Sequence, residues 1–243
     1  MDIDLTELVD FKTIDITELR REAGRKNNPD AQYLMVLLNS GGYGRIPVSL
    51  YRARKWAEKG AKEKHPFCLA NHILFSRRSK GDPIGISEHD LMDHEPFMYE
   101  WMAQQLEQEA QKKSPYAQYI LGQLYRTGTV VEKDEDKALS YYFQSARQGY
   151  ATAQFVLGVL VANGFGYFKR YDKPKREKET LEWVRLAAEQ NYADALLLVY
   201  NAYNKVAHQW LERLTEVQKQ IGRPVRGISF YMQKNGTLAS IKP

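Results

Sequence analysis

The sequence contains one stretch twice: AQYILGQLY at residues 117–125 and AQFVLGVLV at residues 153–161. The second copy begins 36 residues after the first. Self-similarity at a period of this length is typical of solenoids built from pairs of helices. We therefore expect an all-α repeat protein, whose function would reside in an extended binding surface.

A fixed spacing between small residues extends the repeat along the chain. The two members of each pair lie seven residues apart: Gly24 and Ala31, Ala61 and Cys68, Ala110 and Ala117, Ala146 and Ala153, Ala188 and Ala195. Small side chains at one spacing indicate a short connection between helices that approach each other closely. The second member of each pair marks a repeat start, which gives five repeats.

Apolar periodicity predicts two helices for most repeats. First-type helices are expected at residues 29–40, 66–78, 115–127, 151–163 and 193–206. Second-type helices are expected at residues 48–63, 97–113, 134–148 and 178–190, after a half-repeat at 16–26 that Asp15 caps. Glycines at 42, 128 and 164 should end first-type helices in the left-handed conformation. Large aromatics are the expected core anchors of second-type helices: Trp56, Tyr141 and Trp183.

The third repeat resembles the Sel-one-like repeat, a relative of the tetratricopeptide repeat. It has Ala117-x3-Leu121-Gly122-x2-Tyr125-x2-Gly128, followed by Asp134-x2-Lys137-Ala138-x2-Tyr141. The resemblance extends over roughly residues 15–205. It implies a right-handed α-solenoid of about five antiparallel helix pairs. It also implies a non-catalytic adaptor or scaffold, since family members are mostly such proteins, many of them bacterial, and include toxin-neutralising proteins.

The organisation predicted from these patterns has three parts. Residues 1–14 form an N-terminal extension, residues 15–206 the helical-repeat solenoid, and residues 207–243 a C-terminal cap. In the cap, residues 210–221 have the apolar pattern of an amphipathic helix. Asn235-Gly236 between two alternating stretches predicts a small β-hairpin, although a tail that orders only on a partner would have the same sequence.

Composition favours a reducing compartment. The chain has 243 residues and a single cysteine, Cys68, which occupies a small-residue packing slot and is expected to be inert. No window is expected to be long and apolar enough to span a membrane, and the acidic first residues lack a signal-peptide pattern. We therefore expect a cytoplasmic protein without a membrane partner.

Charge is distributed unevenly along the chain. The net charge is +5, yet residues 1–18 hold six acids and one base, whereas residues 205–243 hold seven bases and two acids. This asymmetry favours an acidic protein partner near the C-terminal end or head-to-tail self-contact.

Two loops depart from the repeat. The second repeat has an insertion, residues 79–95, with His89 and His94 among four acids. A separation of five positions places the two histidines on different helix faces, so a solvated helix or binding loop is favoured over a metal site. The fourth-repeat loop, residues 167–178, interleaves aromatics with bases that include Lys169, Arg170 and Lys173. That pattern suits single-stranded nucleic acid, but a solvated loop or an electrostatic contact with an acidic protein is favoured.

The expected function is protein–protein interaction, because no phosphate loop, nucleophile elbow or other catalytic motif is present and no cofactor is implied. Positions 2, 6 and 9 residues after each repeat start are predicted to face a concave groove. The predicted groove residues are Tyr33, Tyr119, Arg126, Phe155, Asn201 and Asn204. The aromatics at the first of these positions would instead be structural if they pack between repeats.

Three functional hypotheses follow. The first is a scaffold that binds a partner protein through the concave face and inserted loops. The second is a bacterial immunity protein that occludes a cognate toxin or effector. The third is a nucleic-acid-binding accessory protein that uses the basic loop at 167–178.

Overall fold

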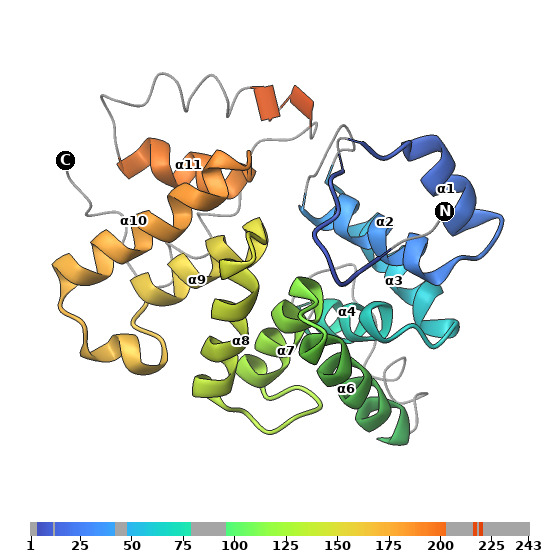
Figure 1. Cartoon of the computed structure of the whole chain (residues 1–243), viewed down its shortest axis with the longest axis horizontal. Coiled ribbons are helices and arrows are strands. Elements are labelled where there is room, and N and C mark those ends of the chain that lie inside the picture. Colours follow the sequence, from blue (N-terminus) through green and yellow to red (C-terminus); the bar gives the residue numbers. More distant parts are fainter. Residues whose placement is uncertain are drawn as a thin grey trace. The chain divides into compact units, whose positions relative to one another are not determined.

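The structure is a computed structural model that describes residues 4–11, 13–41, 48–78, 96–202, 216–217 and 219–220 (Figure 1). These residues contain ten α-helices, one 3-10 helix and no strand. The helices are α1 (Ile16–Gly24), α2 (Pro29–Gly41), α3 (Leu50–Lys62), α4 (Pro66–Arg78), α6 (Pro96–Gln111), α7 (Pro115–Thr127), α8 (Glu135–Arg147), α9 (Ala151–Ala162), η1 (Gly166–Arg170), α10 (Lys173–Glu189) and α11 (Ala193–Ala202).

The helices predicted between residues 16 and 202 are confirmed, with most ends within two residues of the expected position. Most of the helix predicted at 210–221 lies outside the described residues. One boundary is wrong, because α10 begins at Lys173 rather than at residue 178. Asp172 caps this helix by accepting a hydrogen bond from the Lys175 amide at 2.9 Å. The predicted β-hairpin and the insertion at 79–95 lie outside the described residues.

The chain divides into two compact units, Met1–Ser40 with Ser49–Asp134, and Gly41–Val48 with Glu135–Pro243. In the first unit, α3 packs on α4, α6 on α7, and α4 on both α6 and α7. In the second unit, α9 packs on α8 and α10, and α11 packs on α10. Val217 is buried in the same apolar core as α9, α10 and α11. Each unit is a helical-repeat array.

The connections between repeats share one backbone feature. The first small residue of each pair closes one helix, and three residues after it the chain adopts the left-handed conformation. These left-handed residues are Asn27, Lys64, Lys113, Gly149 and Asn191, with φ between 56° and 92°. In the last four connections this residue donates its amide to the carbonyl of the closing small residue, for example Lys113 to Ala110 at 3.0 Å. The seven-residue spacing therefore reflects one turn geometry used five times, as predicted.

Lys113→Gly is expected to raise the free energy of unfolding by about 0.5–1 kcal/mol. The left-handed conformation costs a residue with a side chain about 1–2 kcal/mol, and the greater backbone entropy of unfolded glycine offsets part of that gain. Urea unfolding followed by circular dichroism would measure it. The neighbouring Lys112→Gly, at ordinary φ, should not be stabilising; equal stabilisation by both changes would contradict the assigned turn.

The repeat starts also carry a hydrogen bond that sequence reasoning missed. Buried glutamines follow the opening alanine in three repeats, and each side-chain amide donates to a carbonyl of the preceding helix: Gln32 to Ala23 at 3.1 Å, Gln118 to Ala110 at 3.3 Å, and Gln154 to Ala146 at 3.1 Å. The last carbonyls of a helix have no partner within the helix, and the glutamine adds a second donor to one that already accepts another bond, such as that from Lys113 to Ala110. The recurring Ala-Gln pair was the available signal.

The expected anchors of the second-type helices are displaced by one residue. Trp56, Tyr141 and Trp183 are only half-buried. The following residue is fully buried in each case: Ala57, Tyr142 and Val184. One residue rotates the side chain by about 100° on a helix, so the predicted anchors lie at the edge of the buried face. The predicted helix ends are confirmed for Gly128 and Gly164, both left-handed, whereas Gly42 lies outside the described residues.

One stretch, Ala151–Arg170, is long and apolar enough to cross a membrane by length and composition alone, so the expectation that no such window exists is wrong. In the structure this stretch is not one helix, because α9 ends at Ala162 and η1 follows. Most of the stretch is buried inside the protein. Its first part, α9, contributes to the apolar core of the second unit.

Candidate functional site

Helix α7 has a narrow accessible strip, which holds two of the predicted site residues. Ten of its 13 residues are buried, and those that are not are Tyr119, Arg126 and Thr127. The strip is ordered by Gln123, whose side-chain amide donates to the Tyr119 hydroxyl at 2.8 Å. The Arg126 guanidinium donates to the side-chain amide oxygen of Gln123, Oε1, at 2.8 Å. Tyr119, Gln123 and Arg126 therefore form one hydrogen-bonded row, which we call the α7 polar row.

The equivalent positions in α2 and α9 have no such row. In α2 they are Tyr33, Leu37 and Ser40, and in α9 they are Phe155, Val159 and Ala162. Among α2, α7 and α9, only α7 combines an aromatic ring, an amide and a guanidinium at these three positions.

Tyr33 and Phe155 are not groove residues, contrary to prediction. Their exposed fractions are 1% and 4%. The Tyr33 ring lies 4.9 Å from that of Phe67 and 6.0 Å from that of Tyr116, measured between centroids. Phe155 packs on Tyr192 at 5.2 Å in the core of the second unit. Both aromatics fill the space between helices, which was the alternative interpretation.

The two predicted asparagines lie at the limit of the description. The backbone of Asn201 belongs to α11, but its side chain and the whole of Asn204 lie outside the described residues. His89 and His94 also lie wholly outside the described residues. Among the residues that are described, no group of three histidine, cysteine or acidic side chains could hold a metal ion.

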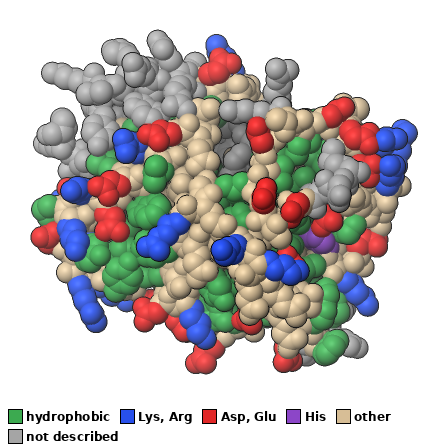
Figure 2. All heavy atoms as spheres, in the orientation of Figure 1, with side chains coloured by type: hydrophobic (Ala, Val, Ile, Leu, Met, Phe, Trp, Pro, Cys, Tyr) green, Lys and Arg blue, Asp and Glu red, His purple; other side chains and the backbone are tan. Residues whose placement is uncertain are grey.

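The basic segment at 167–178 is ordered by its own contacts. Lys169 pairs with Glu135 at 3.0 Å, and Lys173, which begins α10, lies 3.7 Å from Glu177. Arg170 is exposed. Phe168 is fully buried against Phe143, so it cannot stack on a nucleic-acid base. Acidic and basic side chains are also interspersed on the coloured part of the face in Figure 2.

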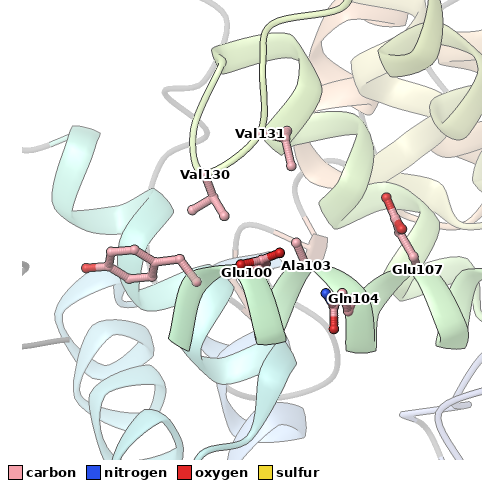
Figure 3. Close-up of a pocket in the computed structure, with 7 residues that line it drawn as sticks. Glu100, Ala103, Gln104, Glu107, Val130 and Val131 are labelled. Carbon is pink, nitrogen blue, oxygen red and sulfur yellow. The ribbon is translucent and has the colours of Figure 1, made fainter. Parts of the chain in front are cut away.

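A second surface feature is a pocket of about 500 Å³ in the first unit (Figure 3). Helix α6 and the loop after α7 line it with Tyr99, Glu100, Ala103, Gln104, Glu107, Val130 and Val131. Glu107 accepts a hydrogen bond from the Tyr125 hydroxyl at 3.1 Å. Val130 has a φ of 69°, which is a strained conformation for a β-branched residue. The lining suits a side chain with an apolar stem and a positive charge.

Cys68 is a packing residue, as predicted. Its side chain is fully buried, and burial raises the pKa of its thiol above the ordinary range. A β-carbon placed on Gly60 of α3 would lie 2.7 Å from that of Cys68, so α3 and α4 approach closely here. A buried thiol that stays protonated is a poor nucleophile.

Comparison with known proteins identifies the repeat. A sequence model of the Sel1 repeat matches residues 29–65, 115–150 and 151–192. These are the three repeats whose start carries the buried glutamine. No protein of curated function matches the sequence.

Three solved structures resemble the chain at low identity. A Sel1 repeat protein from Oxalobacter formigenes is 22% identical, with coverage of 83% of this chain and 76% of that one and a TM-score of 0.40. The protective antigen c5321 of uropathogenic Escherichia coli is 22% identical, with coverage of 86% and 43% and a TM-score of 0.41. The immunity protein Pa5087 from Pseudomonas aeruginosa is 15% identical, with coverage of 84% and 74% and a TM-score of 0.44. The chain is a helical-repeat protein, and three of its segments match the Sel1 repeat.

Proposed function

We propose that this chain is a non-catalytic protein–protein interaction module that binds its partner through the α7 polar row. The observation that carries the proposal is the hydrogen-bonded order of Tyr119, Gln123 and Arg126 on an otherwise buried helix. Tyrosine and arginine are among the residues that dominate the energetics of protein interfaces. The three Sel1 repeats support the general class of function.

Pre-ordering gives the row an energetic advantage. Fixing a side chain at an interface costs about 0.5–1.5 kcal/mol. Gln123 is buried and already bonds both Tyr119 and Arg126, so part of that cost is met during folding. A partner that offers a carboxylate to Arg126 and an apolar surface to the Tyr119 ring would suit this chemistry.

The test begins with the native protein, because its partner must first be identified. Co-purification with mass spectrometry should recover a stoichiometric protein partner. Replacing Tyr119 and Arg126 together by alanine should then weaken binding of that purified partner by about 2 kcal/mol or more, the range of interface anchors. Isothermal calorimetry would measure the affinity, and circular dichroism would establish that the fold is intact.

A matched control is available on α3. Tyr51 and Arg52 are exposed there, so the Tyr51→Ala, Arg52→Ala pair removes the same two residue types from another surface. This control should bind the partner as the unmodified chain does. Equal loss of affinity in both double variants would contradict the assignment to α7.

The other two hypotheses are distinguished by the same experiments. A single toxin-like partner would identify an immunity protein, and retained nucleic acid would favour the accessory role. Replacing Lys169, Arg170 and Lys173 should change mainly the association rate and its salt dependence, as for charges at an interface rim. If these replacements abolish binding while the α7 pair has no effect, recognition lies on the basic segment instead.

A further inference from the structure

The N-terminal segment, residues 4–11, is tied to the turn between α6 and α7 within the first unit. The Ser114 hydroxyl donates to the Leu5 carbonyl at 2.5 Å, and the Val9 amide donates to the Tyr116 hydroxyl at 2.9 Å. Both bonds join groups more than 100 residues apart in sequence. In Figure 1 this segment is the dark blue trace that precedes α1. Its backbone is therefore held much as a bound peptide would be.

The segment has an inner and an outer side. Leu5 and Phe11 are buried, whereas Asp4, Glu7 and Asp10 are exposed. Apolar anchors and backbone hydrogen bonds thus hold the segment, and its acidic side chains face solvent. Recognition of this kind combines hydrogen bonds to the backbone of the peptide with apolar side chains at set positions.

The receiving groups belong to the repeat fold itself. Tyr116 is 1% exposed, and its ring meets that of Tyr33 edge-on at 6.0 Å. Burial raises the pKa of Tyr116 to about 12, so the phenol stays protonated at neutral pH. Ser114 also caps α7 by accepting the Ala117 amide at 3.4 Å. Departure of the segment would remove the backbone groups of residues 4–11 that bond both hydroxyls, and the backbone of another peptide could replace them.

We propose that Ser114 and Tyr116 form a docking site for a short peptide, and that residues 4–11 occupy this site in cis. A competing peptide would need two apolar anchors six residues apart, as Leu5 and Phe11 are. The tether gives the segment an effective concentration in the millimolar range, so a competitor binds only when the segment is released. This proposal concerns a different surface from the α7 polar row and stands independently of it.

The test uses the full chain and a fluorescein-labelled peptide of residues 4–11, DLTELVDF. The full-length Leu5→Asp, Phe11→Ser variant should release the segment and leave Ser114 and Tyr116 in place. The peptide should bind this variant at least tenfold more tightly than it binds the unmodified chain, by fluorescence anisotropy. Adding Tyr116→Phe to the variant should weaken peptide binding about fivefold, because one backbone bond is lost.

Two control peptides distinguish the contribution of the apolar anchors to binding from that of the acidic side chains. A peptide with serine in place of Leu5 and Phe11 should not bind, whereas one with amides in place of Asp4, Glu7 and Asp10 should bind unchanged. Equal binding of the original peptide to both proteins, or binding to neither while the variant remains folded, would overturn the proposal.

Hydrogen exchange provides a measurement that does not depend on the variant's folding. In the unmodified chain, the Val9 amide should exchange by local opening, faster than the amides of α7. Tyr116→Phe should speed its exchange further and leave α7 protected. If residues 4–11 exchange only together with α7, the segment is an integral part of the fold and the docking site does not exist.

Discussion

Tyr33→Ala is expected to lower the free energy of unfolding by about 3–5 kcal/mol, the usual cost of replacing a large buried aromatic by alanine. Tyr33 stands on α2, yet its ring contacts Phe67 at the start of α4 and Tyr116 at the start of α7. Its loss would leave a cavity where three first-type helices meet. Urea unfolding followed by tryptophan fluorescence and circular dichroism would measure the change.

Tyr119→Ala is the matched control, because it replaces the same residue type at the same position of another repeat. Tyr119 is half-buried, and its hydroxyl accepts one bond from Gln123. We expect this change to cost about 1 kcal/mol, the central value for point mutations in general, because the side chain is only half-buried. Similar losses from both replacements would mean that the two tyrosines have equivalent environments, contrary to the structure.

The difference in burial between Tyr33 and Tyr119 could have been predicted from the composition of their helices. In α2, residues 31–39 are all buried, and the polar members of that run are Gln32 and Asn39. A helix that is apolar on every side is enclosed by its neighbours. In α7, Gln123 and Arg126 interrupt the apolar surface, and the accessible strip lies along them. The predicted repeat starts were correct. The prediction of groove residues failed because it assumed that the same repeat position is equally exposed in every repeat.

Helix ends and connections were the most predictable features, because their causes are local. A small residue at each end of a seven-residue connection and a capping side chain such as Asp15 act through nearby backbone groups. The start of α10 was missed although Asp172 and Pro174 carry the same kind of signal. Contacts between distant segments were not predictable, since nothing in the sequence relates Leu5 to Ser114.

The basic segment at 167–178 is a second case in which contacts between elements could not be predicted from the sequence. Its alternating aromatics and bases match a nucleic-acid stacking surface when only composition is considered. In the structure, Tyr167, Phe168 and Tyr171 pack against one another, and the Phe143 ring of α8 lies 6.1 Å from that of Phe168. Lys175 lies over the Tyr171 ring at 3.6 Å, so one of the bases is also used internally. The aromatics therefore hold η1 against α8, which leaves the charges on a structured surface.

Phe168→Ala is accordingly expected to lower the free energy of unfolding by about 3–5 kcal/mol, the cost of deleting a fully buried phenylalanine side chain. If the segment were instead a solvated loop, the same change would alter stability by less than about 0.5 kcal/mol, as surface substitutions do. Arg170→Ala supplies that reference, since Arg170 is an exposed residue of the same 3-10 helix. Chemical unfolding of both variants decides between the two descriptions. A large loss for Phe168→Ala with none for Arg170→Ala would establish that this segment is part of the second unit's core, and that its bases act only from a fixed surface.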